Sequence, residues 1–233
     1  MEIFISTPRP YFLLKYVEKV EMVWIIIGVL HNLELNIVSS TFAKWYDFFM
    51  SPLEQRKFKR IRSELLKSAS GRVLELGSGT GINFPFYHNV DIVIAIEPSQ
   101  PMIDRSLTKQ KAAVVPIEIV HASAENLPFE DHTFDTVVAT LVFCTIPNVE
   151  KAINELKRVC KPDGKVLLFE HVKMENAALS KMQESLTPFW KKVCDGCCLD
   201  RETLREFTNQ GLKIERVEHF YKDLFAVAVL RNK

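Results

Sequence analysis

The sequence predicts a doubly wound α/β domain, with a mainly parallel seven-stranded sheet, helices on both faces and an N-terminal helical extension. Three observations predict this fold class. Short runs rich in Val, Ile and Leu alternate with helical patterns from Arg72 onward. A turn with three glycines follows the first of these runs directly. The composition, 47% hydrophobic and 25% charged over 233 residues, is typical of a globular protein with a sizeable core.

The elements follow one another in a regular order. Strands are expected over residues 72–76, 92–97, 117–121, 136–141, 166–170, 212–217 and 224–230. Helices are expected over 52–67, 99–109 and 148–160, the last with Asn148 as its N-cap. The basic residues of the first helix, Arg62 among them, indicate a solvated face. Residues 173–200 interrupt the alternation and are expected to fold over the carboxyl edge of the sheet, where ligands bind in such folds.

Residues 1–40 differ from residues 41–233 in their pattern of apolar residues, which recur at helical spacing, and we assign them to a separate apolar helical extension. The uninterrupted apolar run 22–30 is shorter than the about 20 residues that a membrane span needs. Three interpretations stay open: a helix packed on its own domain or on a second subunit, a shallow membrane anchor, or a poorly ordered extension.

Charge and cysteine content exclude some classes of protein. A net charge of +1 gives no basic excess for nucleic acid. Five cysteines, an odd number in a chain of this length, indicate reduced thiols and a cytoplasmic protein, which would sit peripherally at the cytosolic face of a membrane if the extension anchors it.

The glycine turn carries the cofactor prediction. Gly77, Ser78, Gly79 and Gly81 follow a buried strand, and a short helix is expected next. Glycine lets a ligand approach the backbone, and a helix start offers free N–H groups. The spacing departs from the dinucleotide pattern because Ile82 follows Gly81. Glu75 in the strand would repel a pyrophosphate but suits the ammonium and sulfonium groups of S-adenosylmethionine.

Two later segments agree with a nucleoside ligand. Glu97, followed by Pro98, ends the second strand 20 residues after Gly77, where an acidic residue grips ribose hydroxyls in nucleotide-binding α/β folds. Ala124 and Glu125 follow the third strand, where small and acidic residues can border an adenine. Thr140, at the end of the fourth strand, is expected to line the methyl-bearing end of the ligand.

These segments, in this order, resemble the class I S-adenosylmethionine-dependent methyltransferases, including those of ubiquinone and menaquinone biosynthesis. The matching motifs are 75–81, 97–98, 123–129, 134–135 and 161–164. Segments 45–47, 140–144, 169–172 and 195–202 are similar to methyltransferase-like family seven, the membrane-associated alkyl-thiol methyltransferases. The resemblance implies a Rossmann-like fold, S-adenosylmethionine as methyl donor with S-adenosylhomocysteine as product, and Tyr46 closing over the donor.

Methyl transfer from a sulfonium needs orientation rather than a covalent intermediate or a metal. His171, at the end of the fifth strand, is the first candidate base and Asp195 the second. Cys144 and Cys197 are candidates for the substrate pocket. A metal role for the single cysteine cluster is not expected, because a structural zinc site commonly takes four ligands from two such pairs.

A small thiol is the expected acceptor, and a quinone precursor or a lipid head-group amine is the alternative. Other classes also stay open: a cofactor-binding protein without catalysis, an NAD-dependent oxidoreductase, and a membrane-organising protein. The partner is otherwise a small molecule, with membrane contact or self-association assigned to the N-terminal helix.

Overall fold

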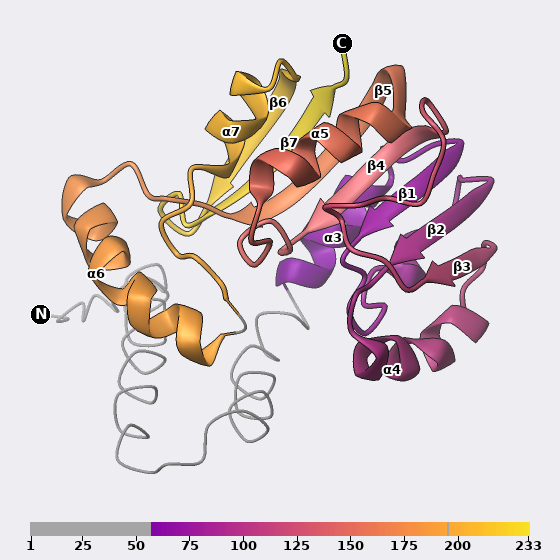
Figure 1. Cartoon of the computed structure of the whole chain (residues 1–233), viewed down its shortest axis with the longest axis horizontal. Coiled ribbons are helices and arrows are strands. Elements are labelled where there is room, and N and C mark those ends of the chain that lie inside the picture. Colours follow the sequence, from indigo (N-terminus) through magenta and orange to yellow (C-terminus); the bar gives the residue numbers. More distant parts are fainter. Residues whose placement is uncertain (1–56, 195) are drawn as a thin grey trace, which may run out of the picture. The chain divides into compact units, whose positions relative to one another are not determined.

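The computed structural model describes residues 57–194 and 196–233, in which seven strands form one sheet. They are β1 Arg72–Leu76, β2 Ile92–Ile96, β3 Ile117–Val120, β4 Phe134–Thr140, β5 Cys160–His171, β6 Lys213–Phe220 and β7 Phe225–Arg231. The order is β3-β2-β1-β4-β5-β7-β6 (Figure 1). Strands β1 to β5 pair in parallel, whereas β7 pairs antiparallel with both β5 and β6. The predicted mainly parallel, seven-stranded sheet is confirmed.

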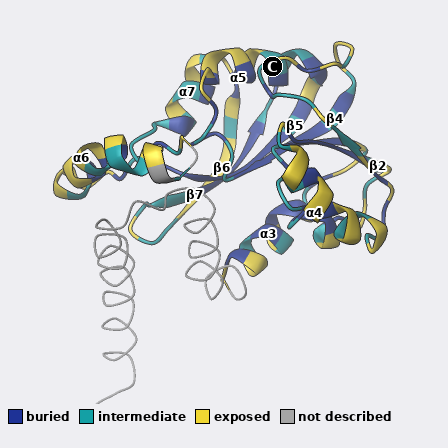
Figure 2. Cartoon of the chain, turned by 60° about the horizontal axis from the view of Figure 1, so that its bottom comes forward, coloured by how far each residue is buried: buried dark blue, intermediate teal, exposed yellow. Residues whose placement is uncertain are grey.

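Helices cover both faces of this sheet. They are α3 Lys59–Leu66, α4 Gln100–Lys111, α5 Val149–Val159, α6 Ala177–Val193 and α7 Thr203–Asn209. Figure 2 shows α5 and α7 on one face and α3 and α4 on the other. The predicted cap of α5 is confirmed, because the Asn148 side chain accepts a hydrogen bond from the Lys151 backbone N–H at 3.0 Å.

The central strands are buried because helices cover them from both sides. Four of the five residues of β1 and six of the seven of β4 are buried. On the α5 face, Val149, Ala152, Ile153, Leu156 and Val159 bury one stripe of the helix against the sheet. On the α3 face, Phe58 packs edge-on to Phe169 and Phe225, with ring centroids 5.0 Å apart in each pair.

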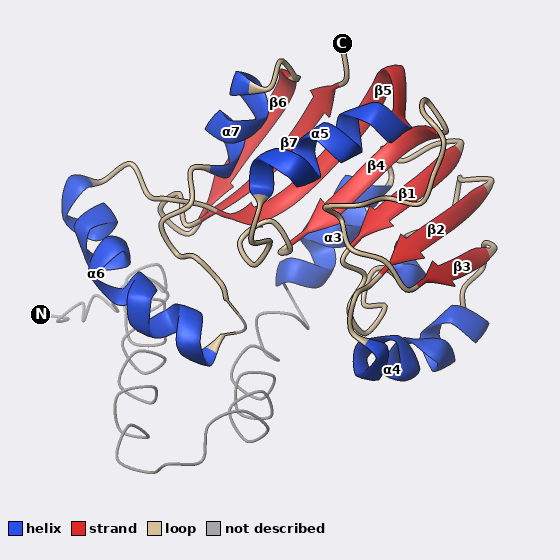
Figure 3. Cartoon of the chain, in the orientation of Figure 1, coloured by secondary structure: helices blue, strands red, loops and turns tan. Residues whose placement is uncertain are grey.

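The structure differs from the predicted elements at the start of β5. Strand β5 begins at Cys160, which pairs with Phe134, so the expected turn 162–164 lies inside it as an irregularity with Asp163 at φ +59°. Helix α6, in the segment 173–200, lies beyond the carboxyl end of β5, in agreement with the prediction that this segment lies at the carboxyl edge of the sheet (Figure 3). Gln183 of α6 anchors it there, donating to the backbone oxygens of Val172 at 3.1 Å and Leu199 at 2.8 Å.

Several sequence predictions lie outside the described residues. These are the extension 1–40, its boundary with 41–233, Tyr46 and Asp195, and they stay predictions. None of the described helices combines the length and the apolar content that a membrane span requires.

Candidate functional site

The glycine turn after β1 has three left-handed residues with different surroundings. Gly77, Gly79 and Gly81 have φ of +61°, +54° and +70°. A Cβ at Gly77 would collide with the Val142 side chain, and one at Gly81 would lie 2.6 Å from the Phe84 ring. A Cβ at Gly79 would meet nothing within 4 Å. The outer glycines are therefore required by packing, and the middle one borders open space that a ligand can approach.

Glu97 connects this turn with the loop after β2. Its Oε2 accepts a hydrogen bond from the Gly79 N–H at 2.9 Å, and its Oε1 accepts one from the Ser99 N–H at 3.0 Å. Each carboxylate oxygen keeps a second lone pair, so Glu97 can also accept the hydroxyl protons of a sugar beside Gly79. Pro98 follows directly, and its carbonyl oxygen lies 2.7 Å from His121 Nε2.

The loop after β3 is held to the start of α5. The Asn148 N–H donates to Glu125 Oε1 at 2.7 Å, and the Glu125 N–H donates to Ser123 Oγ at 3.2 Å. Ala124 is buried against the core. The structure therefore gives Glu125 a structural hydrogen bond in addition to any contact with an adenine.

Glu75, which the sequence analysis assigned to the cationic groups of the donor, makes its contacts in the structure within the interior of the domain. The side chain is 1% exposed. Oε1 accepts a hydrogen bond from Asn83 Nδ2 and Oε2 accepts one from the Tyr87 hydroxyl, both at 2.9 Å. Burial raises the pKa of Glu75 to about 7. Side chains of the interior bond to both oxygens, so Glu75 supports the turn from beneath, and its predicted contact with the donor stays a prediction.

Arg62 of α3 belongs to the same buried network, and the expectation of a solvated face is wrong for this residue. It is 3% exposed and donates to Asn83 Oδ1 at 3.0 Å and to Thr140 Oγ1 at 2.6 Å. Asn83 Nδ2 also donates to Thr140 Oγ1 at 2.9 Å. The Thr140 hydroxyl, expected at the methyl-bearing end, thus faces this network. Arg62 follows Phe58 by four residues, so helical spacing alone could have placed it on the buried stripe.

Glu170 is a functional candidate that sequence reasoning missed. It is fully buried, and its Oε1 accepts hydrogen bonds from the backbone N–H groups of Val142 at 3.0 Å and Phe143 at 3.1 Å. Burial raises the pKa of Glu170 to about 7. Since Val142 is the residue packed on Gly77, Glu170 fixes the loop after β4 against the glycine turn.

His171, the predicted base, is buried at the end of β5 beside the Phe225 ring, with the two ring centroids 5.7 Å apart. Burial lowers the pKa of His171 to about 4. The imidazole is therefore neutral at physiological pH, and it is a weak base toward an acceptor of ordinary acidity.

The two predicted pocket cysteines lie together. Cys144, after β4, and Cys197, after α6, form a side-chain hydrogen bond. The neighbouring Cys198 N–H donates to the Cys144 backbone oxygen at 2.8 Å. Arg201 holds this region by donating to the Phe143 and Ile146 carbonyl oxygens. Within the described ranges, no group of His, Cys, Asp or Glu is arranged to hold a metal ion.

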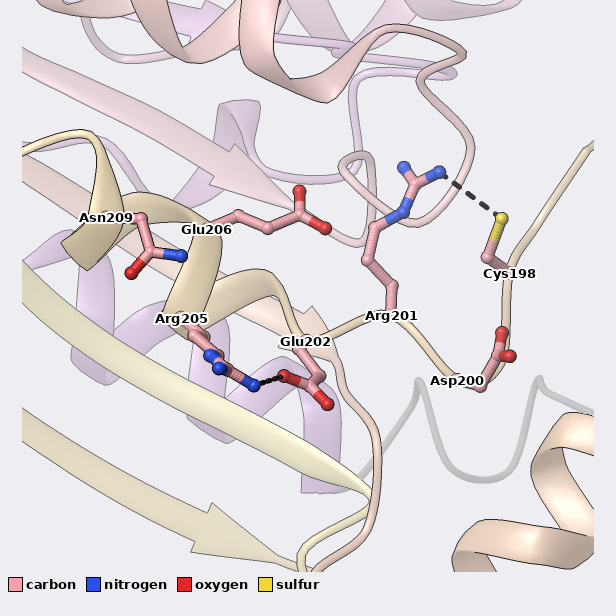
Figure 4. Close-up of a pocket in the computed structure, with 7 residues that line it drawn as sticks. All are labelled: Cys198, Asp200, Arg201, Glu202, Arg205, Glu206 and Asn209. Carbon is pink, nitrogen blue, oxygen red and sulfur yellow. Dashed lines mark hydrogen bonds and ion pairs between the residues drawn. The ribbon is translucent and has the colours of Figure 1, made fainter.

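A surface cavity of about 460 Å³ opens beside the same loop (Figure 4). Its lining is mostly charged and polar: Cys198, Asp200, Arg201, Glu202, Arg205, Glu206 and Asn209. Arg201 reaches toward Cys198, with Nη2 3.3 Å from Sγ. Neither the glycine turn nor Glu97 lines it, so this cavity is separate from the predicted donor site.

The residues present fit a sulfonium nucleoside. Gly79 leaves open space above the turn, Glu97 has acceptor capacity beside it, and the buried Ser78 Oγ has no hydrogen-bond partner within the described residues. Ser78 is thus available as a donor to a ligand, whereas its N–H is taken by the Ile96 carbonyl at 3.0 Å.

Comparisons with known proteins agree with this geometry. Residues 74–168 match the family model described as a methyltransferase domain. The human thiol S-methyltransferase TMT1B is 36% identical over 173 residues, which cover 69% of this chain and 70% of that protein. The phosphatidylethanolamine N-methyltransferase of Cereibacter sphaeroides is 32% identical over 161 residues, which cover 67% of this chain and 79% of that protein.

Solved structures show the same fold. A SAM-dependent methyltransferase from Aquifex aeolicus aligns with a TM-score of 0.59 and 19% identity, covering 83% of this chain and 98% of that one. The [4+2]-cyclase SpnF aligns with a TM-score of 0.61 and 17% identity, covering 76% and 80%. Because a cyclase shares the fold, the likeness in shape alone assigns no reaction.

Proposed function

Because the chain belongs to the class I S-adenosylmethionine-dependent methyltransferases, we propose that it transfers the methyl group to a small thiol. One observation carries the choice of acceptor: the similarity to thiol S-methyltransferases. Human TMT1B is 36% identical over 70% of its length, and human TMT1A is 29% identical over 80% of its length. These names belong to the relatives, and their acceptor class is what we extend to this chain.

The chemistry of the site supports a thiol. S-adenosylmethionine supplies a methyl carbon activated by a positively charged sulfur. The chain itself has to hold the donor, direct the acceptor in line and exclude water, and orientation alone can contribute about 7–11 kcal/mol. A thiol of pKa about 8.5 is a few per cent thiolate at neutral pH without assistance. His171, with its pKa lowered to about 4, is a weak base. A thiol needs little help to lose its proton, whereas a protonated amine needs a stronger base, so the site suits a thiol better than an amine.

A lipid head-group amine is the second candidate acceptor. It is favoured by the 32% identity to the phosphatidylethanolamine N-methyltransferase, which extends over 79% of that relative. An alkylammonium has a pKa of about 10, so its deprotonation needs a stronger base than His171. Contact of residues 1–40 with a membrane would bring such an acceptor close. Flotation of the full chain and of residues 41–233 with liposomes tests that contact, and equal flotation of the two argues against it.

Matched acceptors distinguish the two candidates. The full chain is incubated with methyl-labelled donor and either 2-mercaptoethanol or ethanolamine, which differ only in the nucleophile, and in a third arm with phosphatidylethanolamine vesicles. We expect labelled thioether and S-adenosylhomocysteine in the first arm. Gly79→Val is the control, because its side chain fills the space at the turn and should abolish labelling in every arm. Label in the amine arms alone would replace the thiol proposal with the second candidate.

A further inference from the structure

Two thiols that are 53 residues apart in sequence meet at the carboxyl edge of the sheet. Cys144 is 5% exposed, whereas Cys197 is half-buried. The side chains share a hydrogen bond, and the backbone bond of 2.8 Å from the Cys198 N–H to the Cys144 oxygen holds their two loops together. One residue of the pair is therefore partly exposed, and the other lies in the interior.

The surroundings make the two thiols chemically unequal. The hydrogen bond from Cys144 lowers the pKa of Cys197, and a hydrogen bond from the Trp190 side chain acts in the same direction. The same pairing, together with burial, raises the pKa of Cys144 well above its ordinary value. Arg201 adds a positive charge, and the buried Glu170 opposes it. Cys197, the more exposed of the two, is thus also the thiol whose pKa is lowered, which favours it as the nucleophile of the pair.

Arg201 holds the geometry of the pair as well as its charge. It donates to the carbonyl oxygens of Phe143 and Ile146, which flank Cys144 in sequence, and its Nη2 lies 3.3 Å from Cys198 Sγ, next to Cys197 (Figure 4). One side chain therefore ties both cysteine loops. The cavity of about 460 Å³ that Cys198 and Arg201 line opens at the same loop.

We propose that Cys197 and Cys144 form a thiol–disulfide exchange site for low-molecular-weight disulfides, with Cys197 as the attacking thiol and Cys144 as the resolving thiol. Such an activity is distinct from methyl transfer and uses no methyl donor, so either can fail without the other. The site lies close to the donor turn, because Val142, two residues before Cys144, packs on Gly77.

The exchange balances in two steps. The Cys197 thiolate attacks a disulfide RSSR, forming a mixed disulfide Cys197–S–S–R and releasing RS⁻, which takes the proton of the Cys144 thiol and leaves as RSH. The Cys144 thiolate then attacks the Cys197 sulfur, forms the Cys144–Cys197 disulfide and expels the second RS⁻. Two electrons pass from the protein dithiol to the substrate disulfide. An excess of a small thiol reverses both steps and restores the dithiol.

The test uses the full chain and 2-hydroxyethyl disulfide as the probe. Release of 2-mercaptoethanol is followed in time, the reaction is stopped with N-ethylmaleimide, and the linked peptides are identified by mass spectrometry. We expect two molecules of thiol per chain and a Cys144–Cys197 cross-link. Cys144→Ser should release one molecule and keep a mixed disulfide on Cys197. Cys197→Ser should slow the release about tenfold or more, whereas Cys194→Ser, in the same loop, should match the wild-type protein.

Three results would overturn the proposal: a wild-type rate in Cys197→Ser, a cross-link that involves Cys194 or Cys198 in place of the proposed pair, or a single molecule of thiol released by the wild-type chain. Thermal unfolding checks that each variant is folded. If Cys144→Ser does not fold, Cys144→Ala replaces it, since alanine suits a buried site and leaves the same mixed disulfide on Cys197 as the expected product.

Discussion

Gly79 and Gly77 share a left-handed backbone but have different neighbours, so alanine at each position separates folding from donor binding. In Gly79→Ala, the new Cβ meets nothing within 4 Å at φ +54°. Its cost to stability is backbone strain alone, about 1 kcal/mol, which is about 2–4 °C in melting temperature for a domain of this size. In Gly77→Ala, the collision with Val142 adds about 1–3 kcal/mol of overpacking. Thermal unfolding should therefore rank Gly77→Ala well below Gly79→Ala.

Donor binding should respond differently. The Cβ of Gly79→Ala stands in the open space at the turn whose N–H donates to Glu97 Oε2, where we propose that the donor binds. We expect the Kd for S-adenosylhomocysteine to rise about tenfold, or about 1.4 kcal/mol, in isothermal titration calorimetry. A folded Gly79→Ala with the wild-type Kd would refute the reasoning, because the donor would then not pass over this residue.

Three further substitutions probe the network around the turn. Glu97→Gln turns an amide NH₂ toward a backbone N–H or a sugar hydroxyl, so the donor Kd in calorimetry should rise about tenfold; an unchanged Kd would contradict the sugar contact. His171→Asn tests the pKa that is lowered from 6.5 to about 4. The unfolded chain binds a proton between these pH values and the folded chain does not, so stability is complete above pH 6.5 and falls as the pH drops toward 4. Urea unfolding at pH 7 and pH 5 should show a larger loss in the wild-type protein than in His171→Asn, and parallel losses would argue against a neutral buried ring. Arg62→Met leaves Asn83 Oδ1 without its buried cationic donor and should lower the free energy of unfolding by about 3 kcal/mol; a wild-type urea midpoint would show that Arg62 is not integral to the network.

The fold was predictable because its signals are local. Alternating apolar runs and helical stripes placed the strands and the main helices, and the antiparallel β7–β5 pairing adds the one feature that periodicity does not specify. The glycine turn was predictable for the same reason, since three closely spaced glycines predict the positive φ that Gly77, Gly79 and Gly81 adopt.

The side-chain directions were not predictable, because they depend on contacts between distant segments. Glu75 faces Asn83 and Tyr87 across a stretch without clear periodicity. In the sequence, the carboxylate of Glu170 indicates only the end of a buried strand. The structure shows that it accepts hydrogen bonds from the loop after β4. The pairing of Cys144 with Cys197 likewise depends on a contact between distant segments, because the loop after α6 meets the loop after β4.

The place of β7 has a consequence for how the protein is made. Phe225–Arg231 follows β5 and β6 in the sequence, yet it fills the interior position between them. During synthesis, β5 and β6 are therefore made before the strand that joins them, and β6 has nothing to pair with until β7 has emerged from the ribosome. Loss of β7 would remove the link between the parallel strands and β6, so a chain without Phe225–Arg231 is expected to be handled by the cell as an unfolded one.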